Sequence, residues 1–229
     1  MGQESVTRPA FYALAPGAWR DYVTLLHPPY TAWHLSYVAI GAALAPELRT
    51  DRLLATLAAF FLALGIGAHA LDELRGRPLR TQIPTGVLWA LALASIVGAV
   101  AIGVAAALAW SLWLLAFVAA GTFLVFAYNL ELFGGRFHTD LWFALAWGAF
   151  PLLTGYFAVA ERLALEALLA AGFAVATSLA QRILSTQVRG VRRGRIDEPV
   201  SAVAVPEKAL RALTFGVVAL AAALLALRW

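Results

Sequence analysis

The sequence predicts an all-α integral membrane protein, a polytopic bundle of transmembrane helices with about seven spans. Apolar residues make up 62% of the 229 residues, charged residues only 13%, and the mean hydropathy is +0.79, so the chain is more apolar than soluble domains. Seven apolar stretches are each long enough to cross a hydrocarbon core of about 30 Å. Basic residues fall mainly in alternate connections between these stretches, which is typical of membrane topology.

The predicted spans cover most of the chain. We place them at residues 30–47, 52–71, 86–108, 110–129, 140–159, 163–184 and 207–227. Only WSLW, residues 110–113, separates the third stretch from the fourth, which requires a very tight turn; six spans would result if the two were one. Pro151 lies inside the fifth stretch, where proline is expected to kink the helix and open a cavity.

Residues 1–29 are predicted to be an N-terminal cytoplasmic segment, and residues 30–229 a single transmembrane helical domain. Within the segment, PGAWRDYVTLLHPP spaces its apolar side chains about one and two helical turns apart, as in a short helix that lies in the membrane interface. Pro28 and Pro29 are expected to end this helix. The start of the chain is mixed polar and aromatic, so we expect no cleavable signal.

The charge distribution predicts the orientation and the class of partner. With seven spans, 13 of the 17 Lys and Arg residues lie on the side of the N-terminus and 4 on the other. The positive-inside rule therefore predicts a cytoplasmic N-terminus and a C-terminus outside. Arginines concentrated at a membrane face favour anionic membrane lipid or a phosphorylated substrate, and we expect no nucleic acid partner.

The first polar cluster lies in GIGAHALDELRGRPLRTQIPTG, residues 65–86. His69, Asp72 and Glu73 are three and four positions apart, so on a helix all three can face one ligand. An imidazole and two carboxylates are a plausible site for a divalent metal or for a metal-bound diphosphate. A structural alternative is a helical salt bridge between Glu73 and Arg77, with the other arginines of the connection serving as topology signals.

The second polar cluster is AQRILSTQVRGVRRGRIDEPV, residues 180–200. It carries five arginines, whose planar groups match phosphate oxygens, so a diphosphate clamp is one hypothesis. A solvated positive-inside loop, or one in contact with anionic lipid, is the alternative. A third cluster flanks the connection between the fourth and fifth spans and contains Tyr128, Arg136 and Asp140; by itself it is also typical of an aromatic belt with ordinary loop charges.

Taken in order, LLHPPYTAW before the first span, RPLRTQIPTG after the second and the polar connection after the sixth resemble the UbiA superfamily of intramembrane prenyltransferases. The stretch from Tyr128 through Arg136 to Asp140 is similar to the family's sequence leading into its fifth helix. The chain resembles a divergent member, because the family's aspartate-rich motifs are replaced here by His69, Asp72 and Glu73 and, in the second motif, by Ser185 and Arg189.

The resemblance implies a UbiA-like bundle that binds a prenyl diphosphate at a cytoplasm-facing cavity, with the help of Mg²⁺, and transfers the prenyl group to an unknown acceptor. It implies catalytic roles for Asp72 and Tyr128 and a metal site at His69, Asp72 and Glu73, for which a single Mg²⁺ ion is the hypothesis. The diphosphate-binding residues it implies are Arg77, Arg80, Arg136, Arg182, Arg189, Arg192 and Arg193. The alternative is a non-catalytic protein on the same scaffold that binds an isoprenoid or a phospholipid.

Two other classes are disfavoured by the residues. The sole lysine, Lys208, begins the seventh predicted span, so a photoreceptor Schiff base in mid-membrane is not expected. Ionisable residues well inside a span are confined to His34 and the neighbourhood of His69, and no inverted repeat is evident, which gives transport little support. The sequence does not define an oligomeric state.

Overall fold

The computed structural model describes residues 8–228, which form helices and connections without a β-strand. The elements in chain order are α1 (Trp19–Leu25), α2 (Pro28–Leu44), α3 (Thr50–Phe60), the π-helical η1 (Phe61–Ala68), α4 (His69–Leu74), α5 (Thr85–Ala109), α6 (Leu114–Asn129), α7 (Leu132–Gly135), α8 (Asp140–Ala144), the π-helical η2 (Leu145–Ala149), α9 (Phe150–Ala160), α10 (Leu165–Arg192), the 3₁₀ turn η3 (Val200–Val203) and α11 (Ala204–Ala226). Segments α3, η1 and α4 are continuous, as are α8, η2 and α9.

Five of the resulting helices are long and apolar enough to cross a membrane. They are Thr50–Leu74, Thr85–Ala109, Asp140–Ala160, Leu165–Arg192 and Val200–Ala226. Helices α2 and α6 are shorter, with 17 and 16 residues. The prediction of an all-helical membrane bundle is confirmed, while the count of seven spans stays a prediction. The tight turn at residues 110–113 is confirmed, because α5 ends at Ala109 and α6 begins at Leu114.

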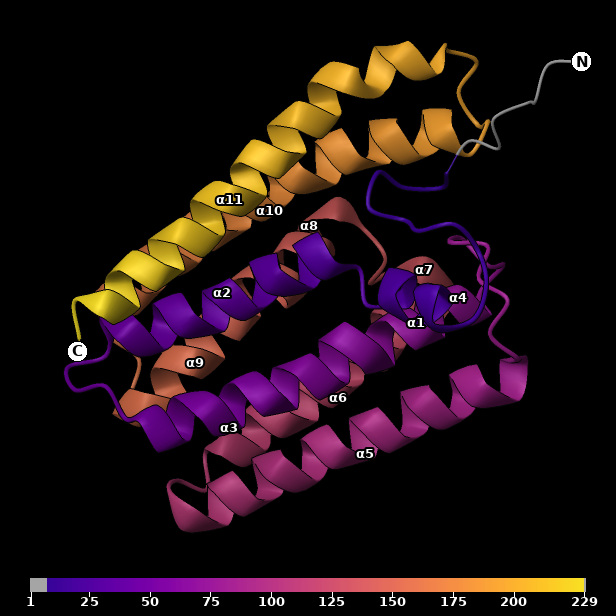
Figure 1. The fold of residues 1–229 in the computed structure, drawn as a ribbon. Coiled ribbons are helices and arrows are strands. Elements are labelled where there is room, and N and C mark those ends of the chain that lie inside the picture. Colours follow the sequence, from indigo (N-terminus) through magenta and orange to yellow (C-terminus); the bar gives the residue numbers. More distant parts are fainter. Residues whose placement is uncertain (1–7, 229) are drawn as a thin grey trace, which may run out of the picture.

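Helices α2 and α9 pack against each other in the middle of the bundle, between its two edges (Figure 1). Figure 1 shows α10 and α11 side by side along one edge and α5 along the opposite edge, with α2, α3, α6 and α9 between them. Helices α2 and α9 approach closely because glycines face the contact. A Cβ atom on Gly41 would lie 2.0 Å from the Leu152 carbonyl oxygen, and one on Gly155 would lie 2.3 Å from that of Val38. This contact builds much of the core around Trp33, Tyr37 and Tyr156.

Pro151 interrupts the regular hydrogen bonding of its helix and leaves a backbone carbonyl available to a buried side chain. Proline has no N–H to bond the carbonyl four residues earlier, which is that of Trp147, and the π-helical segment η2 spans this position. The ring of His34 binds this carbonyl instead: its Nδ1 lies 2.7 Å from the Trp147 carbonyl oxygen. The predicted disturbance at Pro151 is therefore a π-helical segment that fixes a buried imidazole against the next helix.

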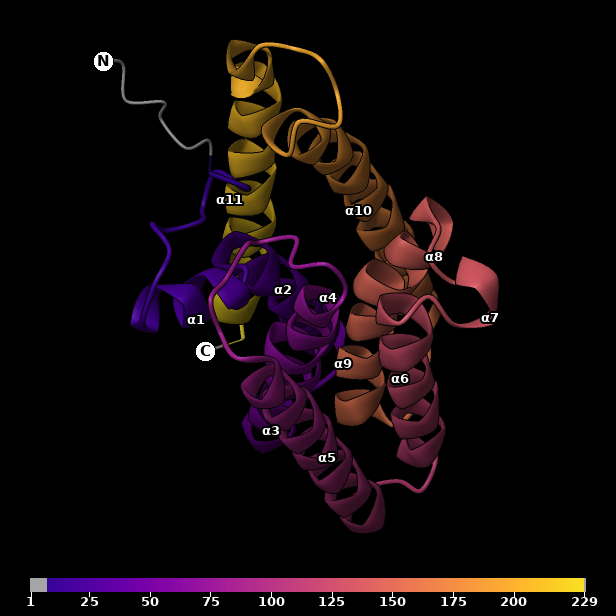
Figure 2. The ribbon, with the colours of Figure 1, turned by 90° about the vertical axis from the view of Figure 1, so that its right-hand side faces the viewer.

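The predicted N-terminal helix is also present, as α1. It packs at the end of the bundle near α4. Its buried Asp21 accepts hydrogen bonds from the backbone N–H of Gly17, at 2.9 Å, and of Gln82, at 2.8 Å. Asp21 thus joins α1 to the connection between α4 and α5, at the end of the molecule that Figure 2 views directly.

Candidate functional site

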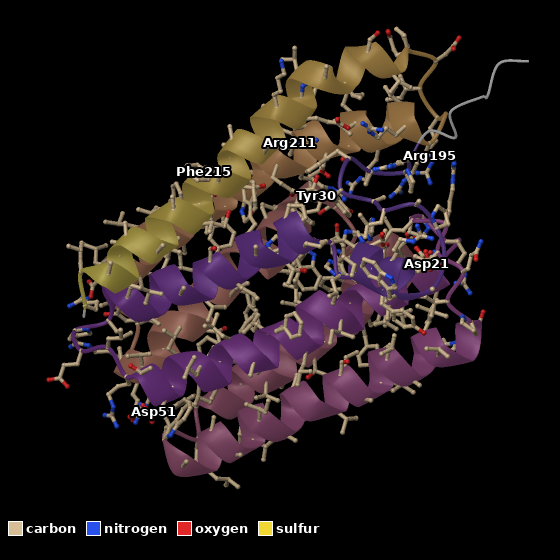
Figure 3. All side chains as sticks on the ribbon, viewed as in Figure 1. Asp21, Tyr30, Asp51, Arg195, Arg211 and Phe215 are labelled. Carbon is tan, nitrogen blue, oxygen red and sulfur yellow. The ribbon has the colours of Figure 1, made fainter. Side chains whose placement is uncertain are left out.

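A polar cavity of about 730 Å³ lies at the end of the bundle where α4, the connection after α6 and the end of α10 meet. Figure 3 marks this end with Arg195 and Asp21, and Asp51 lies at the other end. All four histidines of the chain line the cavity, together with five arginines. The only acidic side chains among its lining residues are those of Asp72 and Glu131. The lining is therefore strongly positive and suits an anionic ligand.

Six of the residues singled out from the sequence line this one cavity, although they come from three separate connections. They are His69, Asp72, Tyr128, Arg182, Arg189 and Arg193. The half-buried carboxylate of Asp72 makes no hydrogen bond or ion pair with any side chain of residues 8–228. Asp72 is thus free to interact with a ligand.

Glu73 is not part of the cavity, which corrects the metal triad inferred from the sequence. Its fully buried carboxylate accepts hydrogen bonds from the backbone N–H groups of Leu79 and Thr81, each at 2.9 Å, and from the Thr81 hydroxyl at 2.8 Å. Arg77 binds the same connection, through the carbonyl of Ile83 and the hydroxyl of Thr85. The expected Glu73–Arg77 salt bridge is therefore also wrong: both side chains shape the connection between α4 and α5.

Four of the predicted diphosphate-binding arginines lie outside the cavity. Besides Arg77, these are Arg80, Arg136 and Arg192. Arg80 and Arg136 are exposed. Arg192 forms an ion pair with the buried Glu207, which ties the end of α10 to the start of α11. These positions could not be separated from the lining arginines by sequence, because all belong to basic connections.

Within residues 8–228, the side chains do not form a metal site of their own. No group of three or more His, Asp or Glu side chains in the part of the chain that the structure describes is placed to hold a metal ion. The triad fails because Asp72 lines the cavity whereas Glu73 is turned into the α4–α5 connection. The positive charge that the lining residues themselves supply to this cavity comes from arginine side chains.

Of the five lining arginines, two are held by acids, and Arg189, Arg193 and Arg195 have no ion pair with residues 8–228. Arg182 donates to Asp140 at 3.0 Å and lies over the ring of Phe143. Arg75 pairs with Glu131 at 3.0 Å. Burial and the neighbouring Arg189 lower the pKa of Arg193, with Asp72 acting in the opposite direction, so an anion placed between these guanidiniums would relieve their repulsion.

His27 is a lining residue that the sequence did not reveal as functional, because its only visible role was to precede two prolines. Its ring is stacked on that of His69, with centroids 4.0 Å apart and planes at 14°. Its Nδ1 lies 2.7 Å from the Tyr12 hydroxyl. Burial lowers the pKa of His27 well below its ordinary value, and His69 lowers it further. The imidazole is therefore neutral at pH 7.

Several buried polar atoms of the lining residues lack a partner within residues 8–228. They are His27 Nε2, the Tyr128 hydroxyl, Gln181 Oε1 and Arg193 Nε. Buried polar atoms in proteins are normally hydrogen-bonded. Four such atoms around one cavity, against one elsewhere in the described chain, at Arg52, indicate a place that is shaped for a polar group.

A second, apolar cavity adjoins the polar one. It lies between α3, α5, α6 and α9 and has a volume of about 110 Å³. Leu64 and Trp147 line both cavities. The ring of Trp147 meets that of Tyr128 edge to face at 5.5 Å, so aromatic surface borders the junction. The two cavities together suit a ligand whose charged head group lies in the polar cavity and whose hydrocarbon chain lies in the apolar one.

Fold and site together define a helical membrane protein with an arginine-lined cavity beside an apolar one, the two sharing Leu64 and Trp147 in their linings. No protein-family model matches the chain, and neither a curated protein sequence nor a solved structure is significantly similar to it.

Proposed function

We propose that this protein binds an isoprenyl diphosphate at a cytoplasm-facing cavity and transfers the prenyl group to an acceptor, as a divergent UbiA-like intramembrane prenyltransferase with seven spans. The observation that carries the proposal is the junction at Leu64 and Trp147, where the arginine-lined cavity meets the apolar one. An amphiphilic diphosphate needs both environments, side by side. The concentration of basic residues on the side of this cavity supports a cytoplasmic opening and a cytoplasmic N-terminus.

The arginines would bind the diphosphate. Arg189 and Arg193 have no ion pair within residues 8–228 and can offer N–H donors to phosphate oxygens, while Arg182 is oriented by Asp140. When the allylic C–O bond breaks, the bonding electrons leave with pyrophosphate, and fixed positive charge lowers the energy of that departing anion. We assign this charge to the arginines that line the cavity.

Aromatic rings and Asp72 would serve the other half of the reaction. The ring of Tyr128, flanked by His138 at 4.4 Å and Trp147 at 5.5 Å, offers aromatic surface to a developing allylic cation. The acceptor forms the new bond to the allylic carbon and loses a proton. Asp72, the lining carboxylate without a side-chain partner among residues 8–228, can take that proton or orient the acceptor.

One observation favours a second function, a protein that holds the lipid diphosphate without turning it over. Glu73 is committed to the α4–α5 connection, and the described residues hold no cluster of metal ligands. A cavity with arginines and one free carboxylate can bind phosphate without Mg²⁺. Binding that is indifferent to Mg²⁺ and not followed by pyrophosphate release would support this alternative.

The test places purified protein in nanodiscs with farnesyl or geranylgeranyl diphosphate, with and without Mg²⁺, and follows both binding and pyrophosphate release. We expect binding in both conditions, and release once an acceptor from a panel of membrane-soluble phenols, quinone precursors and alcohols is supplied. The variant Arg189→Ala is expected to lose binding, and Arg136→Ala, on an exposed residue outside the cavity, is the matched control. No binding of either diphosphate would refute both functions.

A further inference from the structure

The apolar cavity has the dimensions of a single hydrocarbon chain. On α5 its lining runs from Ile96 to Ala106 and on α6 from Val125 to Leu114, which at the rise of an α-helix is a length of about 15 Å. Its volume of about 110 Å³ is room for roughly eight to ten water-sized spheres. Spread evenly over that length, this volume has a mean cross-section of about 7 Å², so the cavity is narrow.

Small residues explain why this space exists and why it is narrow. The lining includes Ala55, Ala59, Ala99, Gly103, Ala106 and Gly121. Larger side chains close in between them: a Cβ atom on Gly103 would lie 2.5 Å from Val118, and one on Gly121 would lie 3.1 Å from the ring of Phe150. Two chains of a phospholipid therefore have no room side by side.

Trp110 lies at the far end of the cavity from the polar site. It follows the last residue of α5, in the tight turn before α6. The guanidinium of the buried Arg52 lies 5.1 Å from the centre of its ring. Arg52 is itself fixed by Glu161 at 2.7 Å and by the carbonyl of Ala158 at 3.1 Å. The indole is thus backed by a cation that is anchored to the end of α9.

From this geometry we propose that the apolar cavity selects bound hydrocarbon chains by their length, and that Trp110, at its far end, sets the maximum chain length. An extended chain advances about 1.2 Å per bond, by the geometry of an extended backbone, and an isoprene unit has four chain bonds. A cavity of about 15 Å then holds about three isoprene units, with the first carbons at Trp147. The inference rests on the proposed function and names its ligand class: single-chain isoprenyl diphosphates near farnesyl length.

The experiment measures dissociation constants in nanodiscs for a series of isoprenyl diphosphates: geranyl, farnesyl, geranylgeranyl and a long polyprenyl diphosphate. We expect the tightest binding near farnesyl and about tenfold or weaker affinity for the polyprenyl compound, because forcing extra carbons against a packed wall costs free energy. Trp110→Ala is expected to remove this limit. Trp113→Ala is the matched control, since Trp113 lies in the same turn but is 75% exposed and does not line the cavity.

A second variant works in the opposite direction. Ala99→Leu adds volume at mid-depth of the cavity, so it is expected to shift the preference toward geranyl diphosphate, and its larger side chain enters free space. Equal affinity for all chain lengths in the unaltered protein, or an unchanged preference in both variants, would overturn the inference and leave the proposed function standing. Failure of every diphosphate to bind would overturn the proposed function together with the inference.

Discussion

The hydroxyl of Tyr12 lies 2.7 Å from Nδ1 of His27, and the His27 ring in turn stacks on His69. This contact places the segment before α1 against the wall of the polar cavity. Phe11, the neighbour of Tyr12, packs with the cluster between α10 and α11 and meets Arg211. The N-terminal segment therefore connects the cavity wall to the last two helices.

The buried His27 predicts a loss of stability at mildly acidic pH. Its pKa in the folded protein is well below the ordinary value of about 6.5 because of burial. The unfolded chain thus binds the proton first, and the stabilisation present above pH 6.5 is lost as the pH falls toward the folded pKa, by up to about 1.4 kcal/mol per pH unit. Unfolding midpoints in nanodiscs between pH 7.5 and 5 test this. His27→Gln is expected to be less sensitive to pH, and equal slopes would contradict the prediction.

Two adjacent acids are expected to behave in opposite ways. In Glu73→Gln, the NH₂ group of the new side chain replaces one carboxylate oxygen, so the buried backbone N–H of Leu79 or of Thr81 faces a donor instead of an acceptor. This should destabilise the protein by about 2 to 3 kcal/mol. Asp72→Asn should unfold like the unaltered protein, within about 0.5 kcal/mol, yet lose most prenyl transfer. Unfolding and pyrophosphate release measured on both variants separate the roles. Lost activity with normal stability in Glu73→Gln would place that residue in the site after all.

The arginines that line the cavity should matter for binding, and those outside should not. Arg189→Ala removes a charged donor that has no ion pair within residues 8–228, so the affinity for a diphosphate should fall by about 10- to 100-fold. Arg192→Met should leave affinity nearly unchanged but lower the unfolding midpoint, because the buried Glu207 loses its partner. Isothermal titration with inorganic pyrophosphate and with farnesyl diphosphate distinguishes head recognition from chain recognition. Equal losses in both variants would point to a diffuse electrostatic effect.

The contact between α2 and α9 should be intolerant of a single methyl group. In Gly41→Ala the new Cβ would lie 2.0 Å from the Leu152 carbonyl oxygen, so the helices must separate, at a cost of about 3 kcal/mol or more. Gly172→Ala, with nothing within 4 Å of its added Cβ, is the control and should be neutral or slightly stabilising. Monodispersity after extraction and thermal unfolding measure the effect. A normally stable Gly41→Ala would contradict the close packing of these helices.

The sequence by itself determined the helical membrane class and the approximate place of each long helix, because apolar stretches of sufficient length have few alternatives in a bilayer. It also located the three polar connections, of which Asp72, Tyr128 and Arg189 proved to share one cavity. The tight turn at WSLW and the short helix α1 followed from local pattern in the same way.

Only the tertiary structure decided which polar residues face one another. Asp72 and Glu73 are neighbours on the chain, yet successive residues of a helix point about 100° apart, so one lines the cavity while the other holds the α4–α5 connection. In the polar cavity the His27 ring stacks on that of His69, and at the end of the apolar cavity the Arg52 guanidinium lies against the ring of Trp110. These relations depend on long-range packing between helices, which the periodicity of a single sequence does not encode.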